Sequence, residues 1–155
     1  MTGALFLLLF SLAVMTDLHT RISDSFNAQG LMATLGARLV HVGDGEVHIE
    51  MPFSKALSQQ RGYVHAGAVT SIVDSACGYA GLTKAPQGCD VVTAEFKINF
   101  MRPALGERFL AVGRVQSSGK LLAVCTGEVR AFAKAGDTDY KVVAMMQATI
   151  VNVAQ

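Results

Sequence analysis

The stretch GYVHAGAVTSIVDSACGYAGLT, residues 62–83, decides the fold that the sequence predicts. Small residues fill the positions between apolar side chains that recur at helical spacing: Val69, Ile72, Val73, Ala76 and Ala80. We therefore predict a helix over residues 66–82 that is buried nearly all round. A helix of this kind lies at the centre of a domain, with the other elements packed around it.

Asp74 is the one residue of formal charge between Arg61 and Lys84, and an unpartnered carboxylate in an apolar helix is destabilising unless it becomes neutral. One interpretation is structural, with the carboxylate hydrogen-bonded to Ser71, Ser75 or a backbone amide. The other is chemical: Asp74 acts as a general base that activates water, or as a nucleophile that attacks a carbonyl carbon. The sequence leaves these alternatives open.

The composition limits the class of protein and its partners. At 155 residues with 51% hydrophobic residues, the chain fits one domain with a real core. Thirteen basic and twelve acidic side chains form no basic stripe, so we expect no nucleic-acid partner. Cys77, Cys89 and Cys125 form no CxxC or Cys/His cluster. We therefore expect no zinc site, and buried thiols in a reducing, cytoplasmic compartment.

The first fourteen residues, MTGALFLLLFSLAV, are almost wholly apolar and carry no charged side chain. A membrane-spanning helix needs about 20 apolar residues. Asp17, His19 and Arg21 interrupt this run too early, so we expect no membrane span. Ser11 and Ala13 offer a small-x-small cleavage site, although no Lys or Arg precedes the apolar run. A secretory signal therefore stays open as one interpretation.

Met15 supports a second interpretation of the N-terminus, because MTDLHTRI reads as an ordinary start of a cytosolic chain. Residues 1–15 are then an extension from an upstream initiation codon and lie outside the native domain. From residue 16 onward the sequence contains no repeat, no low-complexity segment and no linker that would divide it. We predict a single domain over residues 16–155.

Two elements precede the central helix. Residues 16–36 have helical spacing with Gly30 as the expected stop, and their apolar positions are Leu18, Ile22 and Phe26. The stretch ARLVHVGDGEVHIEMP, residues 37–52, alternates on both sides of the turn at residues 43–45, which predicts a hairpin. Its expected inward-facing side chains include Leu39, Val47 and Ile49.

Four β-rich stretches follow the central helix and the turn at residues 85–88. They are residues 89–102, 107–118, 121–134 and 140–153. Glycine-containing turns at residues 117–120 and 135–137 connect them as hairpins. The sheet is therefore expected to be mainly antiparallel, and the element order predicts an α+β domain whose sheet wraps around the central helix.

This order, together with VHAGAVTSIVDSACG, VVTAEFKINFMRPALGERFLAVGRV and the turn GKLLA at residues 119–123, resembles the hotdog-fold acyl-CoA thioesterases of the PaaI-like branch. The resemblance covers about residues 20–153. In that branch the helix opens with His-Gly-Gly, and an Asp follows nine residues after the His. This chain has His65-Ala66-Gly67 and Asp74, so the spacing matches and the middle Gly does not. The resemblance implies hydrolysis of acyl-CoA to a free acid and coenzyme A, with no cofactor or metal.

The resemblance also implies roles for single residues. The backbone amide after the His, here that of Ala66, polarises the carbonyl, at a helix start where Gly67 adds a further amide. Gln59, with Gln60 as the register alternative, helps to hold the carbonyl or is an ordinary loop amide. His65 contacts the sulfur leaving group or only caps the helix. Thr93 orients the water beside Asp74 or is an ordinary β-branched strand residue.

Helix geometry makes a stronger statement than motif matching. Ala66 and Asp74 are eight residues apart, which is about 12 Å along an α-helix. One carbonyl group cannot meet both, so the two halves of a site must come from different chains. Two antiparallel helices across a two-fold axis would create two equivalent sites. We therefore predict that a homodimer is required for activity, and further pairing into a homotetramer stays open.

Several side chains carry two interpretations each. Four basic residues either meet the phosphates of coenzyme A or are solvated charges: Arg61, Lys97, Arg102 and Lys120. Five large residues either line an acyl tunnel or belong to the core: Phe26, Met51, Phe53, Tyr63 and Tyr79. Three histidines have no motif around them and are expected to be ordinary surface or edge residues: His19, His41 and His48.

Two other functions remain as alternatives to a thioesterase. A hotdog hydratase or dehydratase would act on an acyl thioester, and it would need a His and an acid together at one substrate carbon and oxygen. A non-catalytic acyl-CoA binding module would keep the fold and the ligand groove. Such a module does not need an ionisable residue at position 74, so the presence of Asp74 counts against this alternative.

Overall fold

The computed structural model describes residues 17–154 of the chain. Both interpretations of the N-terminus, the secretory signal and the extension over residues 1–15, concern residues outside this range. Among residues 17–154, no helix combines the length and the apolar character that crossing a membrane requires.

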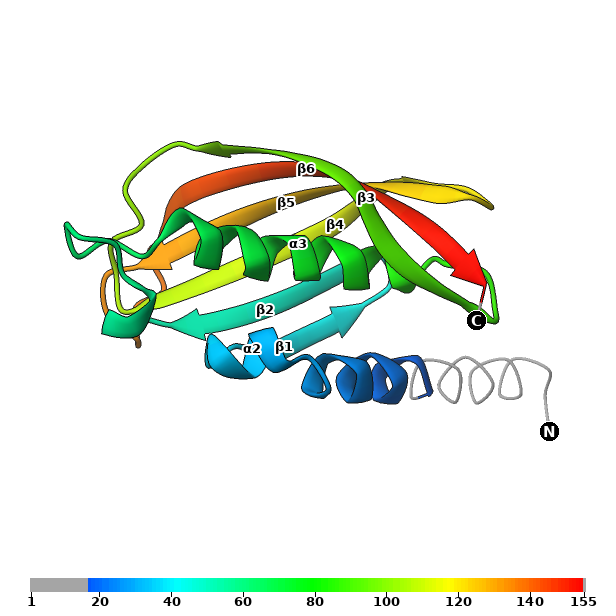
Figure 1. The fold of residues 1–155 in the computed structure, drawn as a ribbon, viewed down its shortest axis with the longest axis horizontal. Helices are drawn as coiled ribbons and strands as arrows, with labels where there is room; N and C mark the ends of the chain where they lie inside the picture. Colours follow the sequence, from blue (N-terminus) through cyan, green and yellow to red (C-terminus); the bar gives the residue numbers. More distant parts are fainter. Residues whose placement is uncertain (1–16, 155) are drawn as a thin grey trace.

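The elements are arranged as one sheet with a long helix along it (Figure 1). In chain order they are a helix over residues 17–27, α2 (Gly30–Thr34), β1 (Arg38–Gly43), β2 (Glu46–Pro52), a 3-10 turn (Lys55–Leu57), α3 (Ala66–Leu82), β3 (Cys89–Phe100), β4 (Arg108–Ser118), β5 (Leu122–Phe132) and β6 (Lys141–Ala154).

The sheet has six strands in the order β1-β2-β4-β5-β6-β3, and every neighbouring pair is antiparallel. It curves around α3, which contacts β2 to β6 (Figure 1). Each predicted strand lies within two residues of an observed one, because turns containing glycine set the ends. The predicted α+β hotdog fold, an antiparallel sheet wrapped around a central helix, is confirmed.

The predicted first hairpin is also confirmed. Val42 pairs with Val47 on either side of the turn, where Gly45 adopts a φ of 79° that favours glycine. Val47 and Ile49 are fully buried, and Leu39 packs against the same core. Alternation along β2 therefore places one side of the hairpin against α3.

The first helix differs from the prediction, which placed its stop at Gly30. The helix ends at residue 27, Gln29 is extended with φ −77° and ψ 108°, and Gly30 begins α2 instead. Ile22 and Phe26 are buried as expected. Met32, six residues after Phe26, would lie about 120° away from the buried face of a continuous helix. The break turns α2 so that Met32 becomes buried, which is the physical reason for the interruption.

The prediction that α3 is buried nearly all round is wrong. One side packs on the sheet, and the other carries a stripe of small and polar residues that stay partly or fully exposed: Ala66, Gly67, Thr70, Ser71, Asp74, Ser75 and Gly78. These residues repeat at three- and four-residue intervals, so they share one face. No element within residues 17–154 covers this face, which we call the open face of α3.

Two glycines fix how closely the sheet approaches α3. A Cβ atom on Gly113 of β4 would lie 2.4 Å from the backbone carbonyl group of Ala76. A Cβ atom on Gly127 of β5 would lie 2.5 Å from a methyl carbon of Val73. Only glycine allows this contact, so the buried side of α3 is held at a fixed depth in the sheet.

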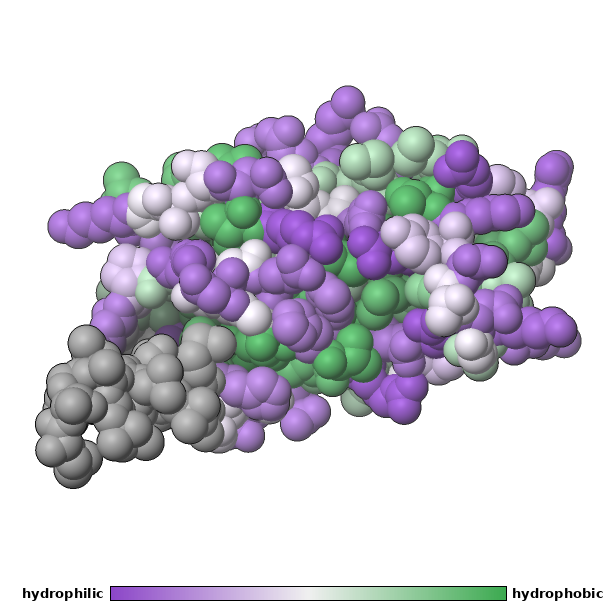
Figure 2. All heavy atoms as spheres, turned by 180° about the vertical axis from the view of Figure 1, so that it is seen from behind, coloured by the Kyte–Doolittle hydropathy of each residue, from purple (hydrophilic) through white to green (hydrophobic). Residues whose placement is uncertain are grey.

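Ion pairs join neighbouring strands on the side of the sheet that faces away from α3. Arg114 of β4 donates to Glu46 of β2 at 2.8 Å, and Arg108 of β4 donates to Glu50 of β2 at 3.1 Å. Seen from behind, hydrophilic side chains lie between smaller hydrophobic areas (Figure 2). Charged cross-strand pairs therefore complement the apolar core on the other side of β2 and β4.

Candidate active site

The start of α3 leaves one backbone donor available. His65 is the N-cap residue, and its Nδ1 accepts a hydrogen bond of 2.9 Å from the Gly67 amide. The amides of Ala68 and Val69 donate to the His65 carbonyl. Within residues 17–154 no acceptor meets the amide of Ala66, which is exposed. Of the two predicted donors, Ala66 is free and Gly67 is engaged in the cap.

A cavity of about 540 Å³ opens at this helix start, and we call it the helix-start cavity. Gln59, Gln60, His65 and Ala66 all line it, so the structure brings most of the first half of the predicted site together. The carbonyl oxygen of the Gln59 side chain accepts a hydrogen bond of 2.7 Å from the Arg61 amide. That bond orients Gln59 within its loop and leaves its NH₂ group as a donor.

Asp74 has a different partner from those that a purely structural role suggested. The Thr93 hydroxyl of β3 donates to Asp74 Oδ1 at 2.9 Å, whereas the Ser71 hydroxyl donates to the Gly67 carbonyl. Burial raises the pKa of Asp74, and the Thr93 hydrogen bond lowers it in part. Asp74 Oδ2 meets no donor within residues 17–154. A carboxylate with one fixed and one free oxygen, and a raised pKa, suits a base or nucleophile.

A second cavity, of about 310 Å³, contains the acid half of the predicted site, and we call it the acid cavity. It is lined by Ser25, Gln29, Asp74, Ser75, Gly78, Tyr79, Asp90, Val91 and Thr93. None of these residues lines the helix-start cavity. The two halves of the predicted site are therefore placed in separate cavities of one chain.

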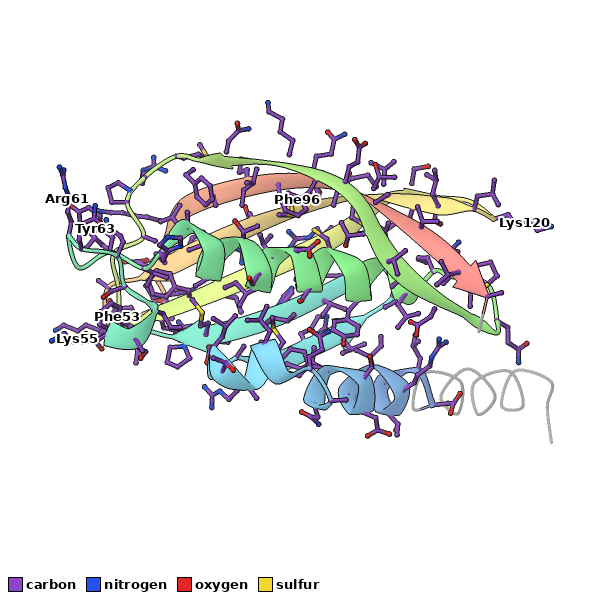
Figure 3. The ribbon with its side chains drawn as sticks, viewed as in Figure 1. Phe53, Lys55, Arg61, Tyr63, Phe96 and Lys120 are labelled. Atoms are coloured by element: carbon purple, nitrogen blue, oxygen red, sulfur yellow. The ribbon has the colours of Figure 1, made fainter. Side chains whose placement is uncertain are left out.

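An edge of the sheet runs beside the open face of α3. The strand β3 pairs with β6 on one side only, since it is the last strand in the sheet. Phe96 pairs with the buried Ala148, and Phe100 pairs with the buried Ala144, so both phenylalanines lie on the inner side. They are 45% and 49% exposed (Phe96 is labelled in Figure 3). Apolar side chains and an unpaired edge thus run along the open face of α3, from the Thr93 partner of Asp74 to Phe100, which lines the helix-start cavity.

The predicted phosphate-binding residues divide into two groups. Arg61 and Arg102 line the helix-start cavity, whereas Lys97 lies beside a small groove on β3 and β6. Figure 3 shows Arg61 at the end of the molecule where α3 begins and Lys120 at the opposite end. Only Arg61 and Arg102 are therefore close to the first half of the site.

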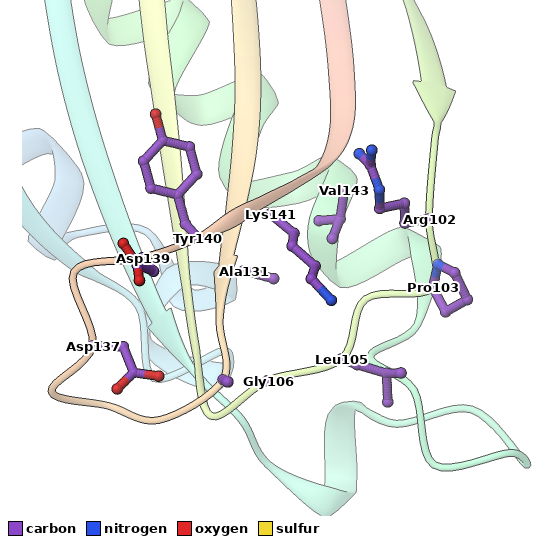
Figure 4. A pocket seen from close by; sticks show the side chains of 11 residues that line it. Arg102, Pro103, Leu105, Gly106, Ala131, Asp137, Asp139, Tyr140, Lys141 and Val143 are labelled. Atoms are coloured by element: carbon purple, nitrogen blue, oxygen red, sulfur yellow. The ribbon is translucent and has the colours of Figure 1, made fainter.

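A third cavity, of about 550 Å³, adjoins the helix-start cavity and shares Arg102, Pro103 and Val143 with it (Figure 4). Lys141, at the start of β6, also lines it. No local signal in the sequence indicates Lys141, because the loop between β5 and β6 brings it to the same cavity as Arg102 only in the folded chain. Two basic side chains, Arg102 and Lys141, and two acidic ones, Asp137 and Asp139, thus border this cavity beside the helix start.

The five expected tunnel residues also divide. Phe26 and Met51 are buried in the core, and Phe53 is exposed. Tyr63 lines the helix-start cavity, and Tyr79 lines the acid cavity. Only the two tyrosines are therefore in a position to meet a ligand.

The cysteines do not supply a nucleophile. Cys77 and Cys125 are buried, as predicted, whereas Cys89 is half-buried. Burial raises the pKa of Cys77 strongly and that of Cys125 to about 11. Both buried thiols therefore stay protonated at neutral pH and are poor nucleophiles.

One group of side chains within residues 17–154 has the spacing of metal ligands. His41 of β1 and Glu46 and His48 of β2 have ligand atoms within 4.8 Å of one another, on the face of the sheet away from α3. Burial lowers the pKa of His48, and Glu46 opposes that effect. Arg114 already neutralises Glu46 at 2.8 Å, so the group is satisfied without an ion. No motif in the sequence indicates this cluster, because only the strand register brings its three residues together.

Comparisons with known proteins agree with this geometry. The family model of the thioesterase superfamily matches residues 61–134, which include α3 and the Thr93 partner of Asp74. A crystal structure of a thioesterase family protein from Silicibacter pomeroyi is 40% identical, covers 89% of this chain and 99% of its own, and superposes with a TM-score of 0.84.

Two further proteins extend the comparison. A protein of Saccharolobus solfataricus with a provisional esterase name is 32% identical over 107 residues, or 68% of this chain and 69% of its own. The PaaI protein of the E. coli phenylacetic acid degradation operon is 19% identical, covers 90% of this chain and 96% of its own, and shares the fold with a TM-score of 0.78. The chain therefore belongs to the thioesterase superfamily.

Proposed function

We propose that this protein is an acyl-CoA thioesterase that hydrolyses acyl-CoA to a free acid and coenzyme A at the interface of a homodimer. The observation that carries the proposal is the division of the site. The free amide of Ala66 and the carboxylate of Asp74 lie in separate cavities of one chain, about 12 Å apart along α3. A second copy with an antiparallel α3 would bring one amide next to the other carboxylate.

The uncovered surface beside Asp74 supports the dimer. The open face of α3 carries only small and polar side chains, which allow two helices to approach closely. Phe96 and Phe100 are apolar and half-exposed on the inner side of the edge strand β3. An unpaired edge with apolar neighbours is a template for another strand. Pairing of β3 with its copy would bury these residues and would align the two α3 helices.

Hydrolysis then follows from the groups at the composite site. The Ala66 amide donates to the thioester oxygen as negative charge develops on it. Asp74 either takes a proton from water, whose oxygen adds to the carbonyl carbon, or adds its own Oδ2 to form an anhydride that water later cleaves. The carbon–sulfur bond breaks in both routes. With Nδ1 accepting from the Gly67 amide, His65 carries a proton on Nε2, which can donate a hydrogen bond to the leaving thiolate. The water that is consumed supplies the proton of the free thiol.

The coenzyme A portion is assigned to the end of the molecule where α3 begins. Arg61 and Arg102 line the helix-start cavity, where no acidic side chain of residues 17–154 joins them, whereas Lys141 shares the adjoining cavity with Asp137 and Asp139 (Figure 4). Phosphate groups interact favourably with such basic side chains. This arrangement supports acyl-CoA as the thioester, with the acyl group on the opposite side of the carbonyl.

The alternatives are less well supported. A hydratase needs a ring nitrogen of His65 as a base, but Nδ1 already accepts the Gly67 amide in the helix cap. A module that only binds acyl-CoA would not need the Asp74 carboxylate to be desolvated and oriented by Thr93. Both arguments favour hydrolysis.

The test is release of free thiol from acyl-CoAs of short, medium and aromatic acyl groups. We expect turnover by the wild-type protein and a loss of about 10²–10⁴-fold in Asp74→Ala. Ser75→Ala changes the neighbouring residue of the same cavity and is the matched control. Unchanged turnover in Asp74→Ala removes Asp74 from the mechanism, and water addition to an enoyl-CoA without hydrolysis would identify a hydratase instead.

A further inference from the structure

Gly78 is a glycine in the middle of α3 for which the fold itself supplies no reason. Glycine destabilises a helix interior relative to alanine. One turn further along, Gly81 is required, because a Cβ atom there would lie 2.9 Å from a methyl carbon of Ile150. A Cβ atom on Gly78 would meet nothing within 4 Å. The space in front of Gly78 is therefore not filled by any of residues 17–154.

The position of this space connects it with the site. Gly78 is four residues after Asp74, so both lie on the same face of α3, and both line the acid cavity. The helix-start cavity takes the coenzyme side of the substrate in the proposed function. The acid cavity then faces the other side of the carbonyl carbon, where the acyl group must lie.

One side of the acid cavity is polar, and its Tyr79 lies five residues after Asp74 on α3, about 7.5 Å further along the helix axis. The Tyr79 hydroxyl lies 3.1 Å from the Ser25 hydroxyl and accepts a hydrogen bond of 2.6 Å from the amide of the Gln29 side chain. Tyr79 is 5% exposed, so its hydroxyl is fixed within the fold. The Tyr79 hydroxyl has one donor and two acceptor positions, and two of these three are used within the set. A purely aliphatic acyl group would cover the remaining position without supplying a hydrogen bond.

We propose that Gly78 and the hydrogen-bonded set of Ser25, Gln29 and Tyr79 determine acyl specificity, selecting short acyl groups that carry a hydroxyl or similar polar group at their far end. This inference rests on the proposed function. Gly78 sets the width of the cavity beside Asp74, and its 310 Å³ volume lies at the small end for ligand sites. The Tyr79 hydroxyl exchanges a hydrogen bond with the polar end of the acyl group.

The first experiment compares kcat/KM for acetyl-, butyryl-, hexanoyl- and decanoyl-CoA in the wild type, Gly78→Ala and Gly78→Val. Each added methyl group fills the cavity, so we expect losses that grow with acyl length and reach about 20-fold for hexanoyl-CoA in Gly78→Val. Gly30→Ala and Gly30→Val are matched controls, because a Cβ atom on Gly30 also meets nothing within 4 Å and Gly30 lies outside the cavity. We expect no length-dependent loss in the controls.

The second experiment pairs butyryl-CoA with 4-hydroxybutyryl-CoA, and hexanoyl-CoA with 6-hydroxyhexanoyl-CoA. We expect kcat/KM to be about 10-fold higher for the hydroxylated member of at least one pair. In Tyr79→Phe we expect about the same kcat/KM for both members of that pair. A wild-type preference for the plain acyl groups, or a preference that survives Tyr79→Phe, contradicts the polar selection.

The outcomes separate this inference from the function on which it rests. Failure of the wild type to hydrolyse any acyl-CoA overturns the proposed function and this inference together. Hydrolysis by the wild type with equal losses at every acyl length in Gly78→Val overturns the acyl cavity alone. Dissociation of a Gly78→Val dimer, measured by size-exclusion chromatography with light scattering, would show that the space is filled by the second copy.

Discussion

Glycines lie on both sides of α3, but the reason for the small residue differs between the two sides. On the side toward the sheet, Gly113 and Gly127 are small because backbone or side-chain atoms of α3 lie within 2.6 Å of where a Cβ would be. On the open face, Gly78 is small although a Cβ atom there would meet no atom of residues 17–154 within 4 Å. The first kind of small residue stabilises the fold, and the second keeps space for a ligand or a second copy. A small side chain alone therefore does not indicate which role a position has.

The role of the open face can be tested by removing its two chemical groups, the Ala66 amide and the Asp74 carboxylate, in separate variants. Ala66→Pro removes the backbone donor at the first helical position, where proline is well tolerated and the extended His65 is compatible with it. Asp74→Asn removes the carboxylate. We expect each variant to lose about 10²–10³-fold in kcat. Circular dichroism checks that both remain folded.

Mixing the two variants then distinguishes a shared site from a site within one chain. Half of the randomly mixed dimers would contain one of each chain and one intact site, so activity should recover to about a quarter of the wild-type value. No recovery after verified subunit exchange contradicts a site built from Ala66 of one chain and Asp74 of the other.

The sheet side is expected to respond in stability instead of activity. Gly113→Ala places a Cβ 2.4 Å from the Ala76 carbonyl group and should lower the free energy of unfolding by about 3 kcal/mol, measured by urea denaturation. Gly78→Ala, on the open face, should raise it by about 0.5–1 kcal/mol. Equal effects of the two substitutions would remove the distinction between the two sides.

A smaller effect is expected at the start of α3, where the two sides meet. His65→Ala removes the side-chain acceptor for the Gly67 amide and should cost about 1 kcal/mol of stability, whereas His65→Asn keeps an acceptor and should cost less. If Nε2–H donates a hydrogen bond to the leaving thiolate, both variants lose turnover to the same degree despite their different stabilities. If turnover instead falls only in proportion to the loss of stability in each variant, His65 acts only as the helix cap.

The smallest expected change is in the pH dependence of the reaction. Burial raises the pKa of Asp74 above its usual 3.8, so activity should fall as the pH drops through that raised value. Thr93→Val removes the hydrogen bond that lowers the pKa and should move this acidic limb to higher pH. A pH profile of kcat/KM measures the shift. An acidic limb that lies at the same pH in Thr93→Val and in the wild type contradicts an effect of Thr93 on the pKa of Asp74.

The same shift has a consequence for stability with a defined sign. A carboxyl whose pKa is raised by folding binds its proton more tightly in the folded state, so the Asp74 contribution improves as the pH falls. Asp74→Asn should therefore be more stable than the wild type at neutral pH. The difference should shrink toward acidic pH, as thermal unfolding at several pH values can show.

The sequence by itself determined the element order, the antiparallel sheet and the buried side of α3, because apolar periodicity and glycine turns are local signals. It also separated the helix start at His65 and Ala66 from Asp74 in the proposed site, since their spacing along a helix fixes their distance. Only the tertiary structure showed the break before α2, the partnership of Asp74 with Thr93, and Lys141 beside Arg102. These depend on which residues the folded sheet brings together, and no local pattern contains that information.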